Sequence, residues 1–267
     1  MGMEVGIVTN GTEIDKFIEP LSKCTWVGVS VDAGSPETMK KIKGKDVFNK
    51  IIGNMQKLIK YSKDNNTKLS MSGQGYGVSY KYLLHPHNIH EINKAVKIAK
   101  EIGCRNFHMR PAGIPWDKID IKNNNFIFFN DEYVKEFQKQ IIMAREMEDQ
   151  NFGVFGITHK FDKKFDIFNQ FKTCHAIFMT AVFMPDTDNN LDSFNLGLCC
   201  DRRGDENLLL GENIGDINEI DKLWGSKKHW EIFDKINVKK CPRCTYQPHN
   251  QIYEYVILKD NMTYKFI

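Results

Sequence analysis

The amino-acid sequence predicts an α/β protein in which a parallel sheet with connecting helices is followed by a small cysteine-rich α+β region. Short apolar runs alternate with longer amphipathic segments up to about residue 150, and strand-like runs joined by polar turns follow. Five of the seven cysteines lie beyond residue 170. Alternation of strand and helix is typical of parallel sheets with right-handed crossovers. We therefore expect two domains, residues 1–150 and 151–267.

The strands expected in the first domain are short runs rich in β-branched and aromatic residues, each ended by a turn signal. These runs are Met3–Thr9, Trp26–Val31, Gly77–Leu84 and Asn106–Arg110.

Amphipathic segments between these runs predict the helices. They are Glu13–Lys23, a region from Pro36 to about Ser62 with a break near Gly44, Ile89–Ile102 and Asp131–Gln150. Serine before proline favours a helix start at Ser35-Pro36, and Gly103 is a stop signal.

The second domain is predicted to mix strands, turns and one long helix. Its expected strands are Phe152–Thr158, Ala176–Phe183, Phe194–Leu198 and Tyr253–Leu258. Ile217–Ile236 is predicted to be helical, Asp186–Asn190 to form a turn, and Leu208–Gly215 to be irregular.

Composition is typical of a soluble globular protein, with 41% apolar residues, 27% charged residues and a net charge of +3. The lysines are scattered over amphipathic segments, so we expect no nucleic-acid partner. No apolar run reaches the roughly 20 residues needed to cross a bilayer, so we expect no membrane partner. The N-terminus lacks a signal-peptide pattern. An odd number of cysteines favours a reducing compartment, and we expect the cytoplasm.

Polar or backbone-exposing residues follow the predicted parallel strands, where ligands of such sheets bind. The candidate contacts are Thr9, Asn10, Gly11, Ser30, Asp32, Asn88 and Arg110. Ser30 and Asp32 suit sugar hydroxyls, Gly11 permits close backbone approach, and Arg110 suits a carboxylate. The alternative is ordinary turn chemistry at Thr9–Gly11 and Asp32, and a helix cap at Asn88.

Cysteines beyond residue 170 are spaced like the ligands of one metal centre. They are Cys174, Cys199 or its neighbour Cys200, and Cys241 with Cys244. Two residues between cysteines allow a turn to aim both sulfurs at one ion or cluster. A lone Cys-x2-Cys would be weak evidence, and the upstream cysteines strengthen it. The residues alone leave zinc, an iron–sulfur cluster and free thiols open.

Several stretches resemble radical S-adenosylmethionine (SAM) enzymes. "GIVTNGTEI", "CTWVGVSVDAGSPETMKKIKG" with "FNKIIGNMQKLI", and "HPHNIHEINKAVKIAKEIG" resemble successive strand–helix units of that family. The tail, from "LGLCCDRRGDENLLLG" through "WGSKKHW" to "KCPRCTYQPHN", resembles its auxiliary-cluster extension, called SPASM or, with one cluster, twitch. The resemblance runs from about Gly6 to Asn250.

The resemblance implies a partial (β/α) barrel with SAM at its open mouth. It places Ser30 and Asp32 on a SAM-binding strand, with the ends before Asn88 and at Arg110 lining the same cavity. It also implies an auxiliary 4Fe-4S cluster on Cys174, Cys199, Cys241 and Cys244, with Cys199 preferred to Cys200.

The sequence departs from the family because it has no Cys-x3-Cys-x2-Cys triplet, which holds the SAM-binding cluster. In the family's order it starts at the third strand, so the first two units of the barrel are missing. A split gene, a truncated product or a degenerate homologue would each explain this. We expect a separate N-terminal fragment, or self-association through the first strand, because open apolar sheet edges attract partners.

The predicted function is that of a partial radical SAM enzyme that modifies a peptide or small molecule by hydrogen abstraction once it is completed. The alternatives are a degenerate homologue and a non-catalytic binding protein stabilised by zinc on the same four cysteines.

Overall fold

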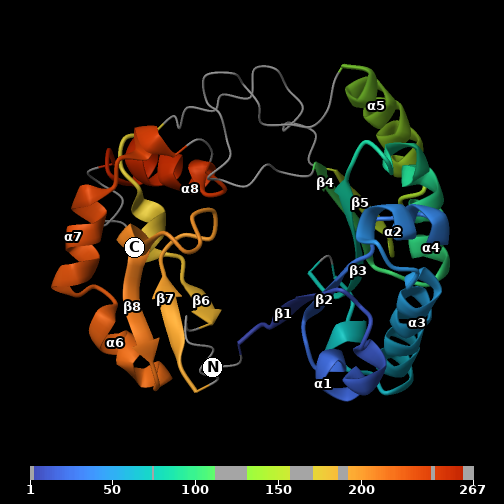
Figure 1. The fold of residues 1–267 in the computed structure, drawn as a ribbon, viewed down its shortest axis with the longest axis horizontal. Coiled ribbons are helices and arrows are strands. Elements are labelled where there is room, and N and C mark those ends of the chain that lie inside the picture. Colours follow the sequence, from blue (N-terminus) through green and yellow to red (C-terminus); the bar gives the residue numbers. More distant parts are fainter. Residues whose placement is uncertain are drawn as a thin grey trace. The chain divides into compact units, whose positions relative to one another are not determined.

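The computed structural model describes residues 3–73, 75–111, 131–156, 171–185, 192–241 and 244–260. The chain divides into two compact units (Figure 1). We call the described residues 3–111 and 131–156 the sheet unit and residues 171–260 the cysteine unit. In the described part of the chain, no helix combines the length and apolar character needed to span a membrane.

The sheet unit contains five parallel strands paired in chain order. They are β1 (Gly6–Thr9), β2 (Trp26–Ser30), β3 (Gly77–Leu84), β4 (Asn106–Pro111) and β5 (Gly153–Gly156). Each pair of neighbours is parallel, so the α/β class predicted from strand–helix alternation is confirmed. Because β5 pairs with β4, this sheet continues past the boundary that we placed near Gln150.

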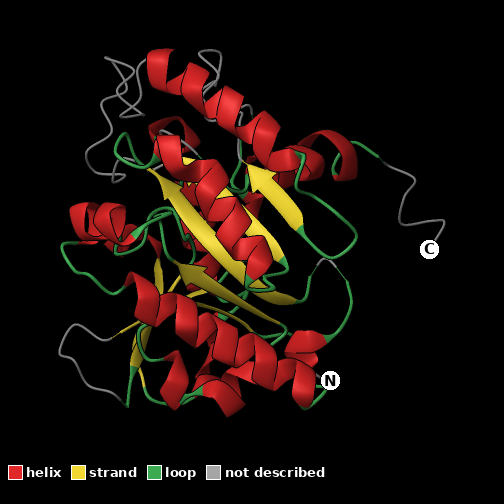
Figure 2. Ribbon diagram, turned by 90° about the vertical axis from the view of Figure 1, so that its right-hand side faces the viewer, coloured by secondary structure: helices red, strands yellow, loops and turns green. Residues whose placement is uncertain are grey.

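Helices connect these strands and cover one face of the sheet (Figures 1 and 2). The α-helices are α1 (Ile18–Ser22), α2 (Pro36–Lys43), α3 (Phe48–Asp64), α4 (Ile92–Glu101) and α5 (Asp131–Arg145). Short 3-10 turns η1 (Ile14–Lys16), η2 (Lys68–Ser70) and η3 (Ile89–Glu91) precede α1, β3 and α4.

The start and the break predicted near α2 are both present. The Ser35 side chain accepts a hydrogen bond from the Thr38 amide, and Pro36 occupies the first turn. Gly44 ends α2 in the left-handed conformation, with φ of 71°. Serine caps satisfy a free amide, and glycine adopts positive φ without strain from a Cβ atom.

The two faces of the parallel sheet have different side chains. Residues at one set of alternating positions, such as Val29, Tyr80 and Phe107, are fully buried under the helices. The opposite face carries Trp26, Lys81 and His108, which are partly buried, and the exposed Arg110. Side chains alternate across a strand, so the second face is available to line a site.

The cysteine unit is built on a three-stranded antiparallel sheet, β6 (Val182–Pro185), β7 (Phe194–Gly197) and β8 (Leu209–Ile214). Its helices are η6 (His175–Phe178), η7 (Glu206–Leu208), η8 (Ile217–Glu219), α6 (Ile220–Leu223), α7 (Lys227–Lys235), η9 (Val238–Lys240), α8 (Gln247–Ile252) and the π-helical turn η10 (Tyr253–Ile257).

Three local predictions in this unit were wrong. Tyr253–Leu258 is helical because it continues α8, and it does not form a strand. Most of Leu208–Gly215 is the strand β8, held by pairing with β7. The segment Ala176–Phe183 begins as a 3-10 turn and becomes a strand only at Val182.

The long helix predicted at Ile217–Ile236 is divided between α6 and α7, because Gly225 has φ of 75°. The predicted turn at Asp186–Asn190 falls on residues that the structure does not describe. Thr158, at the end of a predicted strand, does so as well.

Candidate functional site

The carboxyl ends of the parallel strands bring most of the predicted ligand contacts to one edge of the sheet. Thr9 is the last residue of β1, and Ser30 is the last residue of β2. Arg110 is the last residue but one of β4 and pairs with Leu83 of β3. Arg110 is exposed, and Ser30 is half-buried. We call this edge the mouth of the sheet.

After β1 the chain forms a tight turn, which is stabilised by hydrogen bonds from backbone amides to side chains of the same turn. The Thr9 hydroxyl accepts a hydrogen bond from the Gly11 amide at 3.2 Å, and Asn10 Oδ1 accepts one from the Thr12 amide at 3.0 Å. Gly11 has φ of 81°, and a Cβ there would lie 2.6 Å from Val29 and 2.8 Å from Ile51. Only glycine fits this position, so the turn approaches the sheet unusually closely.

Asp32, two residues beyond β2, has a left-handed backbone with φ of 62° and is 6% exposed. Its Oδ1 accepts a hydrogen bond from the Leu83 amide at 2.6 Å, and its Oδ2 pairs with Lys43 Nζ at 2.5 Å. Positive φ is strained for a residue with a Cβ and persists only where the surroundings fix it. Both carboxylate oxygens therefore have partners within the protein.

Asn88 is fully buried and links the ends of β2 and β3. Its amide nitrogen donates to the carbonyls of Asp32 and Leu83 at 2.8 and 2.9 Å, and its Oδ1 accepts from the His85 amide at 2.7 Å. The Asn88 side chain precedes η3 but makes no capping hydrogen bond there. Its observed role is to hold the mouth in shape.

Glu91 is a mouth residue that the sequence reasoning missed. Its carboxylate accepts hydrogen bonds from the Gly34 amide at 3.0 Å and the Ser35 hydroxyl at 2.7 Å. Burial raises the pKa of Glu91, but hydrogen bonds from Ser35, Thr38 and Gly34 lower it by more, so the pKa falls below 4.5. Glu91 follows the predicted cap Asn88 by three residues, which is the spacing of a capping box. This spacing was the available signal in the sequence.

The uncovered face of the sheet carries a second group of side chains that the sequence reasoning missed. Lys81 and His108 are partners in the β3–β4 register, and Arg110 follows two residues after His108. Lys81 Nζ lies 5.0 Å from the centre of the Trp26 ring. Polar residues at every second position of β3 and β4 were the available signal.

The five cysteines beyond residue 170 are all partly buried and occupy three places in the cysteine unit. Cys174 precedes η6, Cys199 and Cys200 follow β7, and Cys241 and Cys244 lie between η9 and α8.

Cys174, Cys199, Cys241 and Cys244 lie near enough to influence one another. Burial raises the pKa of the Cys174 thiol to about 11, with smaller contributions from Cys199 and Cys241. Burial raises the pKa of the Cys244 thiol to about 12, with contributions from Cys174 and Cys199. Cys200 also influences Cys199, and it bonds with the Tyr246 side chain; burial together with that bond raises the Tyr246 pKa to about 12.

N–H donors surround these thiols, although burial disfavours their charged form. Arg202 Nη1 donates to the sulfur of Cys241 at 3.8 Å, and Asn250 Nδ2 donates to that of Cys244 at 3.9 Å. Backbone amides of Ile177 and other residues approach the remaining sulfurs. In the part of the chain that the structure describes, no three His, Cys, Asp or Glu side chains are arranged to hold a single metal ion.

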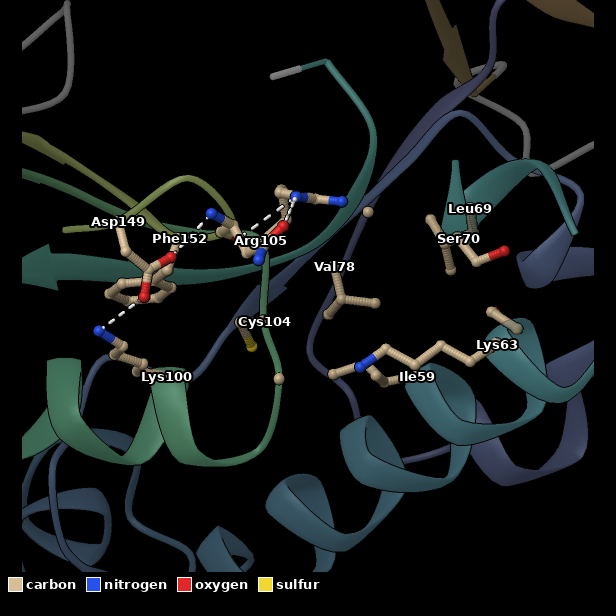
Figure 3. A pocket seen from close by; sticks show the side chains of 14 residues that line it. Ile59, Lys63, Leu69, Ser70, Val78, Lys100, Cys104, Arg105, Asp149 and Phe152 are labelled. Atoms are coloured by element: carbon tan, nitrogen blue, oxygen red, sulfur yellow. Dashed lines mark hydrogen bonds and ion pairs between the residues drawn. The ribbon is translucent and has the colours of Figure 1, made fainter. Parts of the chain in front are cut away.

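A separate pocket of about 390 Å³ lies at the opposite, amino end of β3 to β5 (Figure 3). Lys63, Cys104 and Arg105 line it, and Lys100 pairs with Asp149 at 2.8 Å. Arg105 is bonded to Asn151 and to the Met71 carbonyl. None of the predicted ligand contacts lies in this pocket, so its position does not coincide with the mouth.

Comparisons with known proteins support the fold. No protein-family model matches the sequence, and no curated protein does. The chain is similar in structure to anSMEcpe in its AdoMet-bound form, with a TM-score of 0.53 and 19% sequence identity over 88% of this chain. The match covers 59% of that chain, so this protein spans less than two thirds of its length. This likeness supports the α/β fold expected from the sequence, and at this identity it concerns the fold alone.

Proposed function

We propose that this chain is the SAM-cavity half and auxiliary-cluster part of a radical SAM enzyme that modifies a peptide or a small molecule. The observation that carries the proposal is the fold likeness to a structure with bound AdoMet. The polar mouth of the parallel sheet adds support, because ligands of such folds bind at the carboxyl ends of the strands.

The residues at the mouth fit SAM, and they divide into two roles. Ser30 offers a partly exposed hydroxyl, and Arg110 offers a guanidinium for a carboxylate. Gly11 is buried and its Cβ position faces Val29 and Ile51, so we assign it to shaping the mouth. Asp32 and Asn88 have their polar side-chain atoms bonded within the protein, so we assign them to positioning the mouth. When bound to a reduced cluster, SAM supplies a radical that abstracts hydrogen from the substrate.

The sequence lacks the Cys-x3-Cys-x2-Cys triplet that would hold that cluster. In the described sheet, β1 is an edge strand with Val8 59% exposed. An open strand edge pairs readily with a further strand. We propose that a segment carrying the triplet adds to β1 and completes the enzyme.

The four cysteines of the cysteine unit fit an auxiliary 4Fe-4S cluster. They are partly buried thiols that influence one another and are surrounded by N–H donors, which stabilise cluster sulfurs. We propose the cluster rather than zinc because the tail of the sequence resembles the SPASM or twitch extension.

SAM binding to the full chain tests the proposal. Isothermal titration is expected to show saturable binding that weakens by about tenfold in Ser30→Val, because the hydroxyl contact is lost. Ser72→Val, on an exposed loop before β3, is the control and should bind SAM like the parent. Absence of SAM binding, or equal affinity in both variants, would contradict the proposed site.

A further inference from the structure

One row of the uncovered sheet face combines cationic and aromatic side chains from neighbouring strands. In the register, Ser30 pairs with Lys81, Lys81 with His108, and His108 with Phe155. This row lies two residues deeper along the strands than Arg110, which pairs with Leu83. Neighbouring strands lie about 4.8 Å apart, so the side chains of the row face one common space.

Packing around Gly28 fixes the direction of Lys81. A Cβ on Gly28 would lie 2.6 Å from the Trp26 ring and 2.8 Å from Lys81 Cδ, so both side chains lie over this glycine on the uncovered face. Lys81 Nζ is 5.0 Å from the centre of the Trp26 ring. Trp26 is itself fixed by its Nε1 hydrogen bond to Ser79 at 2.6 Å. The lysine is therefore held in place.

The charge of this row is unbalanced within the described part of the chain. No carboxylate there pairs with Lys81, and Asp32, the acid that influences it, is bonded to Lys43 and Leu83. Burial and Arg110 lower the Lys81 pKa. Burial, with Lys81 and Arg110, lowers the His108 pKa to about 4, so His108 is neutral at pH 7. A partly buried lysine charge beside another cation and without a counter-ion is unfavourable, and a bound anion would relieve it.

We propose that Lys81 and His108 bind a carboxylate of the substrate on the uncovered face of the sheet, in the row of Ser30 and one row deeper than Arg110. This rests on the proposed function and narrows its substrate to one that carries an acidic group. Lys81 provides the charge, neutral His108 provides a ring N–H donor, and the Phe155 ring, 45% exposed, offers an apolar surface beside them. A carboxylate is the chemistry that this combination recognises.

The test uses benzoate as the probe and benzamide as its uncharged match, with the His108 ring followed by NMR in the full chain. Benzoate is expected to bind saturably and to raise the His108 pKa, because a nearby negative charge favours the imidazolium. Benzamide should bind at least about tenfold more weakly. Lys81→Met should reduce benzoate affinity by about tenfold, and Lys57→Met, on the exposed face of α3, should not.

A parallel SAM titration separates this proposal from the proposed function. Binding of SAM together with benzoate supports both. Competition between SAM and benzoate, with the same His108 response, would overturn the substrate role and assign the row to the cofactor. Equal binding of benzoate and benzamide, or unchanged affinity in Lys81→Met with a parent-like thermal melt, would also overturn it. Benzoate binding without SAM binding would contradict the proposed function and leave the carboxylate site supported.

Discussion

The sheet unit and the cysteine unit differ in what holds them together. Among the described residues, the core of the sheet unit contains 31 buried residues, from Ile14 to Val154, whereas the core of the cysteine unit contains seven, from Ile177 to Ile232. A small core rarely stabilises a domain without a disulfide or a metal. We therefore expect the stability of the cysteine unit to depend on the centre proposed at its cysteines, and that of the sheet unit to depend on apolar packing.

The largest expected effect comes from removing the paired cysteines. Cys241→Ser with Cys244→Ser should lower bound iron by roughly tenfold or more and should unfold the cysteine unit, because metal binding and folding are coupled. Amide hydrogen exchange read by mass spectrometry should show lost protection in residues 171–260 and unchanged protection in β2 to β4. Cys200→Ser is the control and should keep its iron, because Cys200 faces Tyr246. Equal loss of protection in both units would break the comparison.

Asn88→Ala should destabilise the sheet unit by about 3 kcal/mol, because it leaves three backbone groups, one of them buried and two partly buried, without their partner. Urea unfolding measures this change. Asn65→Ala removes an exposed hydrogen bond to the Tyr61 carbonyl and should cost under about 1 kcal/mol. Similar losses in the two variants would show that the mouth is not held by Asn88.

Gly11 and Gly44 both have positive φ, but only Gly11 has other atoms close to its Cβ position. Replacing each with alanine therefore distinguishes the cost of backbone strain from the cost of a steric clash. Gly11→Ala should cost about 2 kcal/mol or more, because its Cβ would meet Val29 and Ile51. Gly44→Ala, with φ of 71° and no atom within 4 Å of its Cβ, should cost only about 1 kcal/mol. The difference between their unfolding free energies measures how closely the β1 turn packs, and no difference would refute that packing.

The smallest expected effect is a pH dependence in the sheet unit. The pKa of Glu91 is lower in the folded chain than 4.5, so its contribution to stability is present above pH 4.5 and is lost as pH falls through the lowered pKa. Glu91→Gln should flatten this part of the stability profile, followed by thermal unfolding at pH 3 to 6. Glu101→Gln, on the exposed end of α4, should leave the profile unchanged.

Sequence periodicity predicted the sheet unit well and the cysteine unit poorly. The run Gly77–Leu84 is predicted and observed with identical bounds, because turn residues flank a run with valine and tyrosine at alternating positions, and this strand pairs with β2 and with β4. In the cysteine unit, β8 was missed because its pairing with β7 contains register shifts and no simple alternation.

The sequence predicted where the candidate sites lie better than it predicted what each residue does there. Strand ends indicated the mouth, but the hydrogen bonds that use both oxygens of Asp32 depend on Leu83 and Lys43, remote in the sequence. Likewise, Lys81 and His108 form a pair only through the register of β3 and β4, which composition does not reveal.

Iron and acid-labile sulfide analysis of the full chain, purified without oxygen, tests the account most directly. The thiols at residues 174, 199, 241 and 244 are expected to yield a brown protein with equal amounts of iron and sulfide and broad visible absorption. A colourless protein with one zinc and no sulfide would contradict this, as would one whose cysteines all react freely with an alkylating reagent.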